Sequence, residues 1–142
     1  MSAVATVIAL SAMPGPALAA GTYAWTLTCN TGGNYPGVAS ASWDWLQDGQ
    51  VIVGAGGTAA CYGGGGGTRP TNANGFTVIL TAQAGSKQSS KSATVSFDPA
   101  GGFTKSLKAS AHDSWTECEL DFHFPVCWKD TSSVSATLTM TS

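Results

Sequence analysis

The segment Tyr23–Cys29, YAWTLTC, alternates large apolar side chains with small alanine and threonine side chains. Successive residues of a β-strand point to opposite faces, so this period of two puts the apolar residues on one face. The pattern therefore predicts a half-buried strand. Because the same period recurs through most of the chain, it decides the fold class.

Comparable segments follow at near-regular intervals, and turn residues separate them. The tight-turn dipeptides Asp48–Gly49 and Asn74–Gly75, with the polar or glycine-rich stretches 85–92 and 98–102, mark reversals of the chain. No segment beyond the N-terminal region has a sustained helical period. We therefore predict an all-β fold, an antiparallel β-sandwich of immunoglobulin-like architecture with about seven or eight strands. The predicted strands lie near 23–29, 39–45, 51–53, 76–82, 93–97, 103–109, 118–124 and 134–140.

Residues 1–19 have the features of a cleaved signal peptide. The apolar run 3–12 has the length of an export signal's hydrophobic region and is too short to span a membrane. Ala17–Ala19 supplies the small residues of a cleavage site. No Lys or Arg precedes the run, so either the amino terminus supplies the charge or the start codon lies upstream; a buried N-terminal element is the alternative. We predict a secreted, extracellular protein with one domain, 20–142, and no membrane span.

The charge content is low and nearly balanced. Charged residues make up 10% of the chain, and the formal net charge is −2. Nucleic acids and anionic membrane surfaces require a dense basic face, so neither is a predicted partner. Abundant alanine, glycine and threonine with few lysines favours a bacterial origin.

Four cysteines follow the export signal, which predicts two disulfides in an oxidising compartment. Three pairings are compatible with the count. We predict the sequential one, Cys29–Cys61 and Cys118–Cys127, because each pair is then local within the strand pattern. The spacing typical of zinc sites, Cys-x2–4-Cys, does not occur, which argues against zinc. We predict no metal site and no cofactor.

The glycine run in residues 61–70, CYGGGGGTRP, has three interpretations. A phosphate-binding loop would need a Gly-Lys-Ser/Thr ending followed by a helix, and neither is present. A hinge would need a preceding domain larger than residues 20–60 provide. We predict a slack loop between two strands, tolerant of shortening, with Tyr62 and Arg69 at its edges as candidate binding residues.

The segment 115–124, WTECELDFHF, carries a row of acidic residues. If it is one strand, Cys118, Leu120, Phe122 and Phe124 point inward, and Glu117, Glu119, Asp121 and His123 point outward. The row is then a solvated face balanced by Lys105 or Lys108, a docking face for a basic partner, a cation site, or a carboxylate pair for glycoside hydrolysis. The chain has none of the usual hydrolase motifs, so we predict that it is not an enzyme.

Five tryptophans are many for a chain of this size. Trp25 alternates in phase with apolar residues, and we expect Trp25 and Trp43 in the core. Trp43 and Trp45 share one strand face, so the alternative is an aromatic platform for sugar rings or an anchor at a protein interface. Trp115 and Trp128 flank the second cysteine pair.

Together these features predict a secreted, non-enzymatic binding protein whose partner is a protein. The chain would be an inhibitor, an adaptor or a subunit of a secreted bacterial complex. The alternative is a carbohydrate-binding module for polysaccharide, and a small secreted hydrolase ranks third. The predicted binding residues are Trp43, Trp45, Tyr62, Arg69, Trp115, Glu117, Glu119, Asp121 and Trp128.

Overall fold

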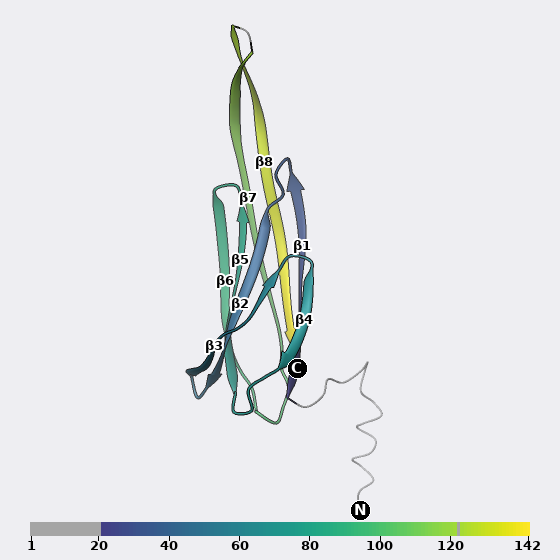
Figure 1. Cartoon of the computed structure of the whole chain (residues 1–142), viewed down its shortest axis with the longest axis vertical. Helices are drawn as coiled ribbons and strands as arrows, with labels where there is room; N and C mark the ends of the chain where they lie inside the picture. The colour runs from purple at the N-terminus through teal and green to yellow at the C-terminus, as the bar shows by residue number, and fades with distance from the viewer. Residues whose placement is uncertain (1–20, 122) are drawn as a thin grey trace, which may run out of the picture.

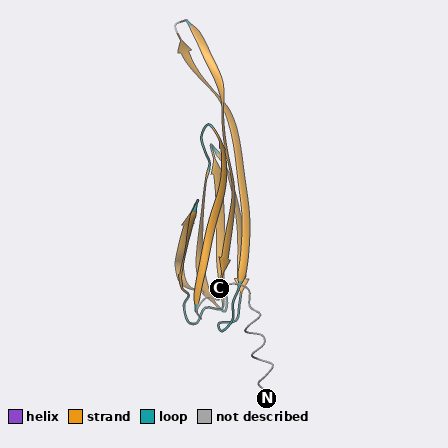
Figure 2. Cartoon of the chain, turned by 90° about the vertical axis from the view of Figure 1, so that its right-hand side faces the viewer, coloured by secondary structure: helices purple, strands orange, loops and turns teal. Residues whose placement is uncertain are grey.

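A computed structural model of the chain describes residues 21–121 and 123–142. The predicted signal peptide, 1–19, lies outside the described residues, and so does Phe122. The described chain is built of antiparallel strands (Figures 1 and 2). No helix in this part of the chain is long and apolar enough to cross a membrane.

Eight strands form two four-stranded sheets that pack face to face, which confirms the predicted β-sandwich. One sheet has the order β4-β1-β8-β7 and the other β3-β2-β5-β6. The strands are β1 (Thr22–Gly33), β2 (Val38–Gln47), β3 (Gln50–Ala60), β4 (Gly63–Thr68), β5 (Gly75–Ala84), β6 (Lys87–Ser96), β7 (Thr104–Asp121) and β8 (Phe124–Thr141).

The core lies between the sheets and follows the predicted alternation. Aliphatic side chains from both sheets fill its centre, including Leu27, Leu80 and Leu138. Aromatic rings fill one end, where Trp45 lies 5.0 Å from Tyr23 and 5.6 Å from Phe76 between ring centroids. Such edge-to-face contacts add to the stabilisation from burial itself.

The glycine run is strand β4, and the prediction of a slack loop is wrong. β4 pairs with β1 in antiparallel register from Thr22↔Thr68 to Leu27↔Gly63. Alternate glycines face the indole of Trp25 and the ring of Tyr23, which occupy the space that side chains on β4 would take. Strand signals in a sequence come from side chains, and glycine has none, so the run gave no alternation to detect.

Both predicted disulfides are present and anchor different parts of the fold. Cys29–Cys61 joins β1 to the turn between β3 and β4, where the chain crosses from one sheet to the other. Cys118–Cys127 joins directly opposed residues of β7 and β8, with 4.1 Å between their Cα atoms.

The last two strands extend well beyond the sandwich (Figures 1 and 2). The pairing of β1 with β8 ends at Gly33↔Ser132, whereas β7 and β8 remain paired from Ser132 to Phe124. We call this self-paired part of the hairpin, Ser114–Asp121 with Phe124–Thr131, the arm. Eight paired residues per strand at 3.4 Å each make it about 27 Å long. The remainder of the sandwich is the body.

Candidate functional site

The arm has two faces, and their assignment reverses the sequence prediction. On β7 the core-facing residues Leu107 and Ala109 are odd-numbered, and the strand continues without a break into Glu117, Glu119 and Asp121. The carboxylates therefore share the side of the hairpin that faces the core in the body. Cys118 and Leu120, predicted to point inward, lie on the opposite side, and both are exposed.

The prediction failed because the arm has no second sheet to cover it. The prediction places the apolar residues against an interior, and that interior stops where β1 ends and β2 begins. The turn after Asp121 also divides the predicted strand 118–124, so Phe124 begins β8 and His123 lies in the turn. The predicted inward position of Phe122 lies outside the described residues.

The inner face of the arm consists of two parallel columns of opposite chemistry. The acidic column on β7 is Glu117, Glu119 and Asp121. The apolar column on β8 lies directly across from it, with the pairs Glu117↔Trp128, Glu119↔Val126 and Asp121↔Phe124. Among the described residues of the arm, Lys129 is the one cation, and its position in the alternation places it on the outer face.

Exposure rises along both columns toward the tip. Trp128 is 39% exposed and Phe124 is 73% exposed. Glu117 is half-buried, whereas Glu119 and Asp121 are exposed. The tip therefore presents apolar surface next to carboxylates that a partner can reach.

A carboxyl pair flanked by two indoles lies at the base of the inner face. The indole N–H of Trp115 donates to Oε1 of Glu117 at 3.0 Å, and that of Trp128 donates to Oδ2 of Asp130 at 3.2 Å. Burial raises the pKa of Asp130 above its ordinary value, and the neighbouring carboxyl group of Glu117 raises it further. Asp130 is 2% exposed, so this acid is not accessible to a substrate.

Loops of the body support the arm at its base. Tyr35 stacks on Trp115 with 5.7 Å between ring centroids, and its backbone N–H donates to the carbonyl oxygen of Thr131 at 3.1 Å. On the other side, the backbone N–H and hydroxyl of Ser86 donate to Asp113 at 2.8 and 2.9 Å. These two bonds hold the pKa of Asp113 below its ordinary value. The base of the arm is therefore held from both sides.

The turn between β5 and β6 reaches the arm because of a glycine. Gly85 has a positive φ of 56°, and a Cβ at this position would collide with the Asp113 carboxylate. Glycine adopts this backbone conformation without steric penalty. It therefore permits the close approach that places Ser86 against Asp113.

Two predicted binding tryptophans and one predicted binding arginine are structural instead. Trp43 and Trp45 are 1% and 2% exposed in the core, so they form no platform for sugar rings. Trp43 confirms the expectation of a core position. Arg69 is buried, and its Nη2 donates to the carbonyl oxygens of Pro99 and Gly101 at 3.0 and 2.8 Å. Its guanidinium also lies 5.0 Å from the centroid of the Phe97 ring.

The other predicted residues remain on the surface. Tyr62 is exposed in the turn between β3 and β4, on the body and away from the arm residues. Trp115, Trp128, Glu117, Glu119 and Asp121 lie together on the inner face of the arm. The structure thus brings five of the nine predicted residues into one surface.

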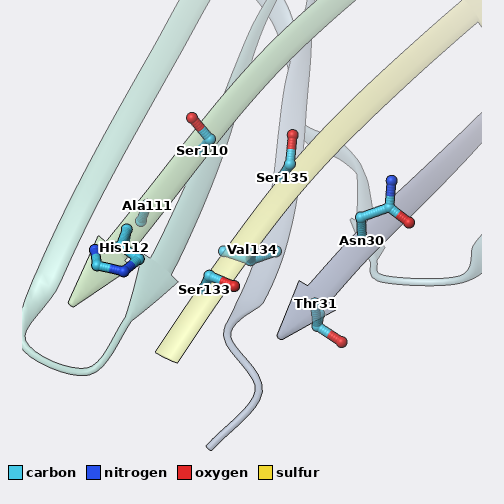
Figure 3. Close-up of a pocket in the computed structure, with 8 residues that line it drawn as sticks. All are labelled: Asn30, Thr31, Ser110, Ala111, His112, Ser133, Val134 and Ser135. Atoms are coloured by element: carbon cyan, nitrogen blue, oxygen red, sulfur yellow. The ribbon is translucent and has the colours of Figure 1, made fainter. Parts of the chain in front are cut away.

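A shallow depression of about 680 Å³ lies on the outer surface of the sheet formed by β4, β1, β8 and β7 (Figure 3). Its polar lining comes from three adjacent strands and includes Asn30, Ser110, His112 and Ser135. It contains no carboxylate, and its one ring is the imidazole of His112. This lining fits neither a sugar platform nor a carboxylate pair, so the arm is the stronger candidate site.

Across residues 21–121 and 123–142, no group of three or more His, Cys, Asp or Glu side chains could hold a metal ion. Comparison of the chain with protein-family models, with curated proteins and with solved structures found no match.

Sequence reasoning missed several residues of the site. Asp130, Val126 and Tyr35 were not singled out, and Phe124 was assigned to the core. A signal for three of them was present, because the alternation of Leu138 and Val134 continues in phase through Asp130, Trp128, Val126 and Phe124. Tyr35 lies between β1 and β2, and nothing in the sequence indicates its stacking on Trp115.

Proposed function

We propose that the chain is a secreted, non-enzymatic binding protein that engages a protein partner through the inner face of the arm. The observation that carries this proposal is the pairing of an acidic column with an apolar column on a hairpin that no second sheet covers. Two disulfides fit an extracellular location, and the one in the arm closes the hairpin near its tip.

The apolar column favours a macromolecular partner. Single exposed apolar residues are normal on protein surfaces, but Trp128, Val126 and Phe124 follow one another along one face. Tryptophan is enriched among the residues that contribute most to binding at protein interfaces. The disulfide and the paired backbone restrain the hairpin, so little conformational entropy is lost when it binds.

The acidic column specifies the charge of that partner. Carboxylates at alternate positions of a strand lie about 7 Å apart and repel one another. A basic partner surface relieves this repulsion and raises the association rate by electrostatic steering. We therefore propose a partner that presents lysine or arginine beside apolar side chains.

The same geometry argues against hydrolysis. A glycosidase needs an accessible acid with a raised pKa and a second carboxylate across a cleft. Here the acid with the raised pKa, Asp130, is buried, and the exposed carboxylates lie in a row along one strand. A binding role requires neither feature.

Two residues at the tip provide a matched test. Phe124 on the inner face and Leu120 on the outer face are 73% and 77% exposed, so replacing either one removes a similar exposed apolar surface. Proteins from the culture medium of the source cells would be captured on the immobilised chain and quantified. We expect Phe124→Ser to lose partners that wild type and Leu120→Ser retain. Equal retention by both variants would contradict the proposal.

Binding of polysaccharide is the competing outcome. Trp128 is the half-exposed indole of the inner face, so sugar binding there would change tryptophan fluorescence. Titration with soluble cell-wall polysaccharides should leave the emission of the wild-type chain unchanged. A saturable change that Trp128→Ala removes would replace the protein partner with a glycan.

A further inference from the structure

The charged residues of the chain are segregated between the arm and one side of the body. The arm holds four of the eight carboxylates, Glu117, Glu119, Asp121 and Asp130. Strand β6 and the body part of β7, residues 104–113, hold four of the six cations, Lys87, Lys91, Lys105 and Lys108. Asp113 is the single carboxylate on these two stretches.

The basic side of the body is an open surface. β6 and β7 are edge strands of their respective sheets, so no further strand of the described chain covers this side. Lys91 and Lys108 line one depression of about 410 Å³ together with the hydroxyl groups of Ser89 and Ser110. The two lysines come from different sheets, and the depression bridges the seam between them.

The carboxylates near the tip of the arm cannot meet Lys108 of the same molecule. Glu119 and Lys108 lie on one continuous strand, eleven residues apart. At 3.4 Å per residue this separation is about 37 Å. The arm also points away from the body along the long axis (Figures 1 and 2).

We propose that the inner face of the arm docks onto the β6–β7 side of a second copy of the chain. This inference rests on the proposed function and specifies the partner. The acidic column then lies against Lys91 and Lys108, and the apolar column covers the lysine stems and the partly buried Val95 and Leu107 on the same two strands.

The symmetry of this contact follows from its geometry. Arm and basic side are different surfaces, so each molecule uses one to bind the copy ahead and the other to bind the copy behind. Such a heterologous contact repeats and produces an open chain or a closed ring. The inner face of the arm is about 27 Å long and two strands, about 10 Å, wide, so its projected area is about 300 Å². A standard interface buries roughly 800 Å² of accessible surface per partner, which is far more than this face offers. Association is therefore weak and depends on concentration and salt.

Sedimentation velocity on the full chain tests the proposal. Wild type is expected to associate with rising concentration at low salt, about 20 mM, and to dissociate at about 500 mM. The arm variant Glu119→Lys/Asp121→Lys and the body variant Lys91→Glu/Lys108→Glu are each expected to associate at least about tenfold more weakly. All four positions are exposed, so both variants should fold.

Mixing the two variants gives the decisive readout. In the mixture the basic arm of the first variant meets the acidic body of the second, which reverses the sign of the original pairing. The acidic arm of the second variant meets the basic body of the first, which is the original pairing itself. At the same total concentration we expect the 1:1 mixture to associate within about twofold of wild type, because each arm finds a matching body on half of the molecules. A misfolded variant would not restore association. As a matched control, Lys129→Glu on the outer face of the arm should not weaken association.

Three outcomes overturn the second-copy inference: a monomeric wild type at low salt, unweakened association of either variant, or a mixture that stays monomeric. The failure of this inference differs from that of the proposed function. If wild type is monomeric while Phe124→Ser still loses a partner that Leu120→Ser retains, the arm binds a different protein. If Phe124→Ser and Leu120→Ser retain partners equally, the proposed function itself fails.

Discussion

Trp25 on β1 lies directly opposite Gly65 on the neighbouring strand β4. The Trp25 indole is so close that a Cβ at Gly65 would be 3.1 Å from the indole nitrogen. The same relationship recurs on the opposite sheet, where the Trp43 indole fills the space beside Gly57. Strands β3 and β4 follow each other in the chain, and in both the missing side chains leave room for tryptophan rings. Glycine is therefore required at Gly57 and Gly65 of these edge strands, because tryptophan rings fill the space that a side chain would occupy.

We predict that Gly57→Ala destabilises the protein strongly. A methyl group at this position overlaps the Trp43 ring, which is buried and cannot move aside. Overpacking of this kind typically lowers the free energy of unfolding by about 1–3 kcal/mol. Urea unfolding measures the loss. Gly54→Ala in the same strand is the control, because its nearest neighbour would be 3.8 Å away. Equal losses for both variants would show that strand propensity, not the Trp43 contact, sets the requirement.

We predict that shortening the five-glycine run to two glycines lowers the thermal unfolding midpoint. The deletion removes β4 pairing with β1 and uncovers the rings of Tyr23 and Trp25. Differential scanning calorimetry detects the change. Gly64→Ala, with ordinary contact distances, should alter stability by no more than about 1 kcal/mol. An unchanged midpoint after the deletion would restore the idea of a slack loop.

The pKa of Asp130 predicts a pH dependence of stability. Its pKa in the folded state is raised above the ordinary value of 3.8, so folding favours the protonated acid. The resulting stabilisation of the folded state is complete below pH 3.8 and is lost as the pH rises through the folded-state pKa. The thermal unfolding midpoint should therefore be lowered by this group as the pH rises from about 4 to 7, and Asp130→Asn should remove that part of the pH dependence.

Asp113 supplies the control of opposite sign. Its pKa is lowered in the folded state, so its contribution is present above pH 3.8 and is lost as the pH falls through the folded-state pKa. Asp113→Asn should lose stability at neutral pH and little at acidic pH. A parallel response of the Asp130 and Asp113 variants would contradict the assignment of these shifts.

The two disulfides are predicted to stabilise different parts of the molecule. Cys29→Ser/Cys61→Ser should lower the unfolding free energy of the whole sandwich by about 3–4 kcal/mol, from the entropy of the loop it closes. Cys118→Ser/Cys127→Ser should act on the arm, which pairs only with itself. Amide hydrogen exchange distinguishes these effects, because loss of protection should be confined to arm residues in the second variant. Loss of body protection there would show that the arm and body unfold together.

The fold was predictable from the sequence because most strands carry an alternating apolar face. Tyr23–Cys29 and the segment 134–140 are examples, and both disulfides followed from their position in that pattern. The exception is β4, whose glycines face the rings of Trp25 and Tyr23 on the neighbouring strand, and these rings occupy the space beside β4. Such a requirement resides in tertiary contacts and leaves no periodic signal.

The site was predictable in composition but not in orientation. Glu117, Glu119 and Asp121 were recognised as a row, and the structure places them in one column. Their facing was wrong because apolar residues near Cys118 were given an interior that the arm does not have. The end of the second sheet determines where the interior stops, and a local pattern does not report the length of a distant strand.

Strand β7 runs without interruption from the core to the tip of the arm, and this continuity fixes the direction in which the arm presents its surface. Odd-numbered side chains of β7 pack against the core in the body. Because the alternation continues without a break, these packed positions determine which side chains face a partner on the arm, some 30 Å away. Packing in the core of the body thus determines which face of the arm each residue occupies, although the core does not contact that part of the arm. Inserting one residue into each strand at the base of the arm would turn the acidic column to the back of the hairpin while leaving the sandwich itself unchanged.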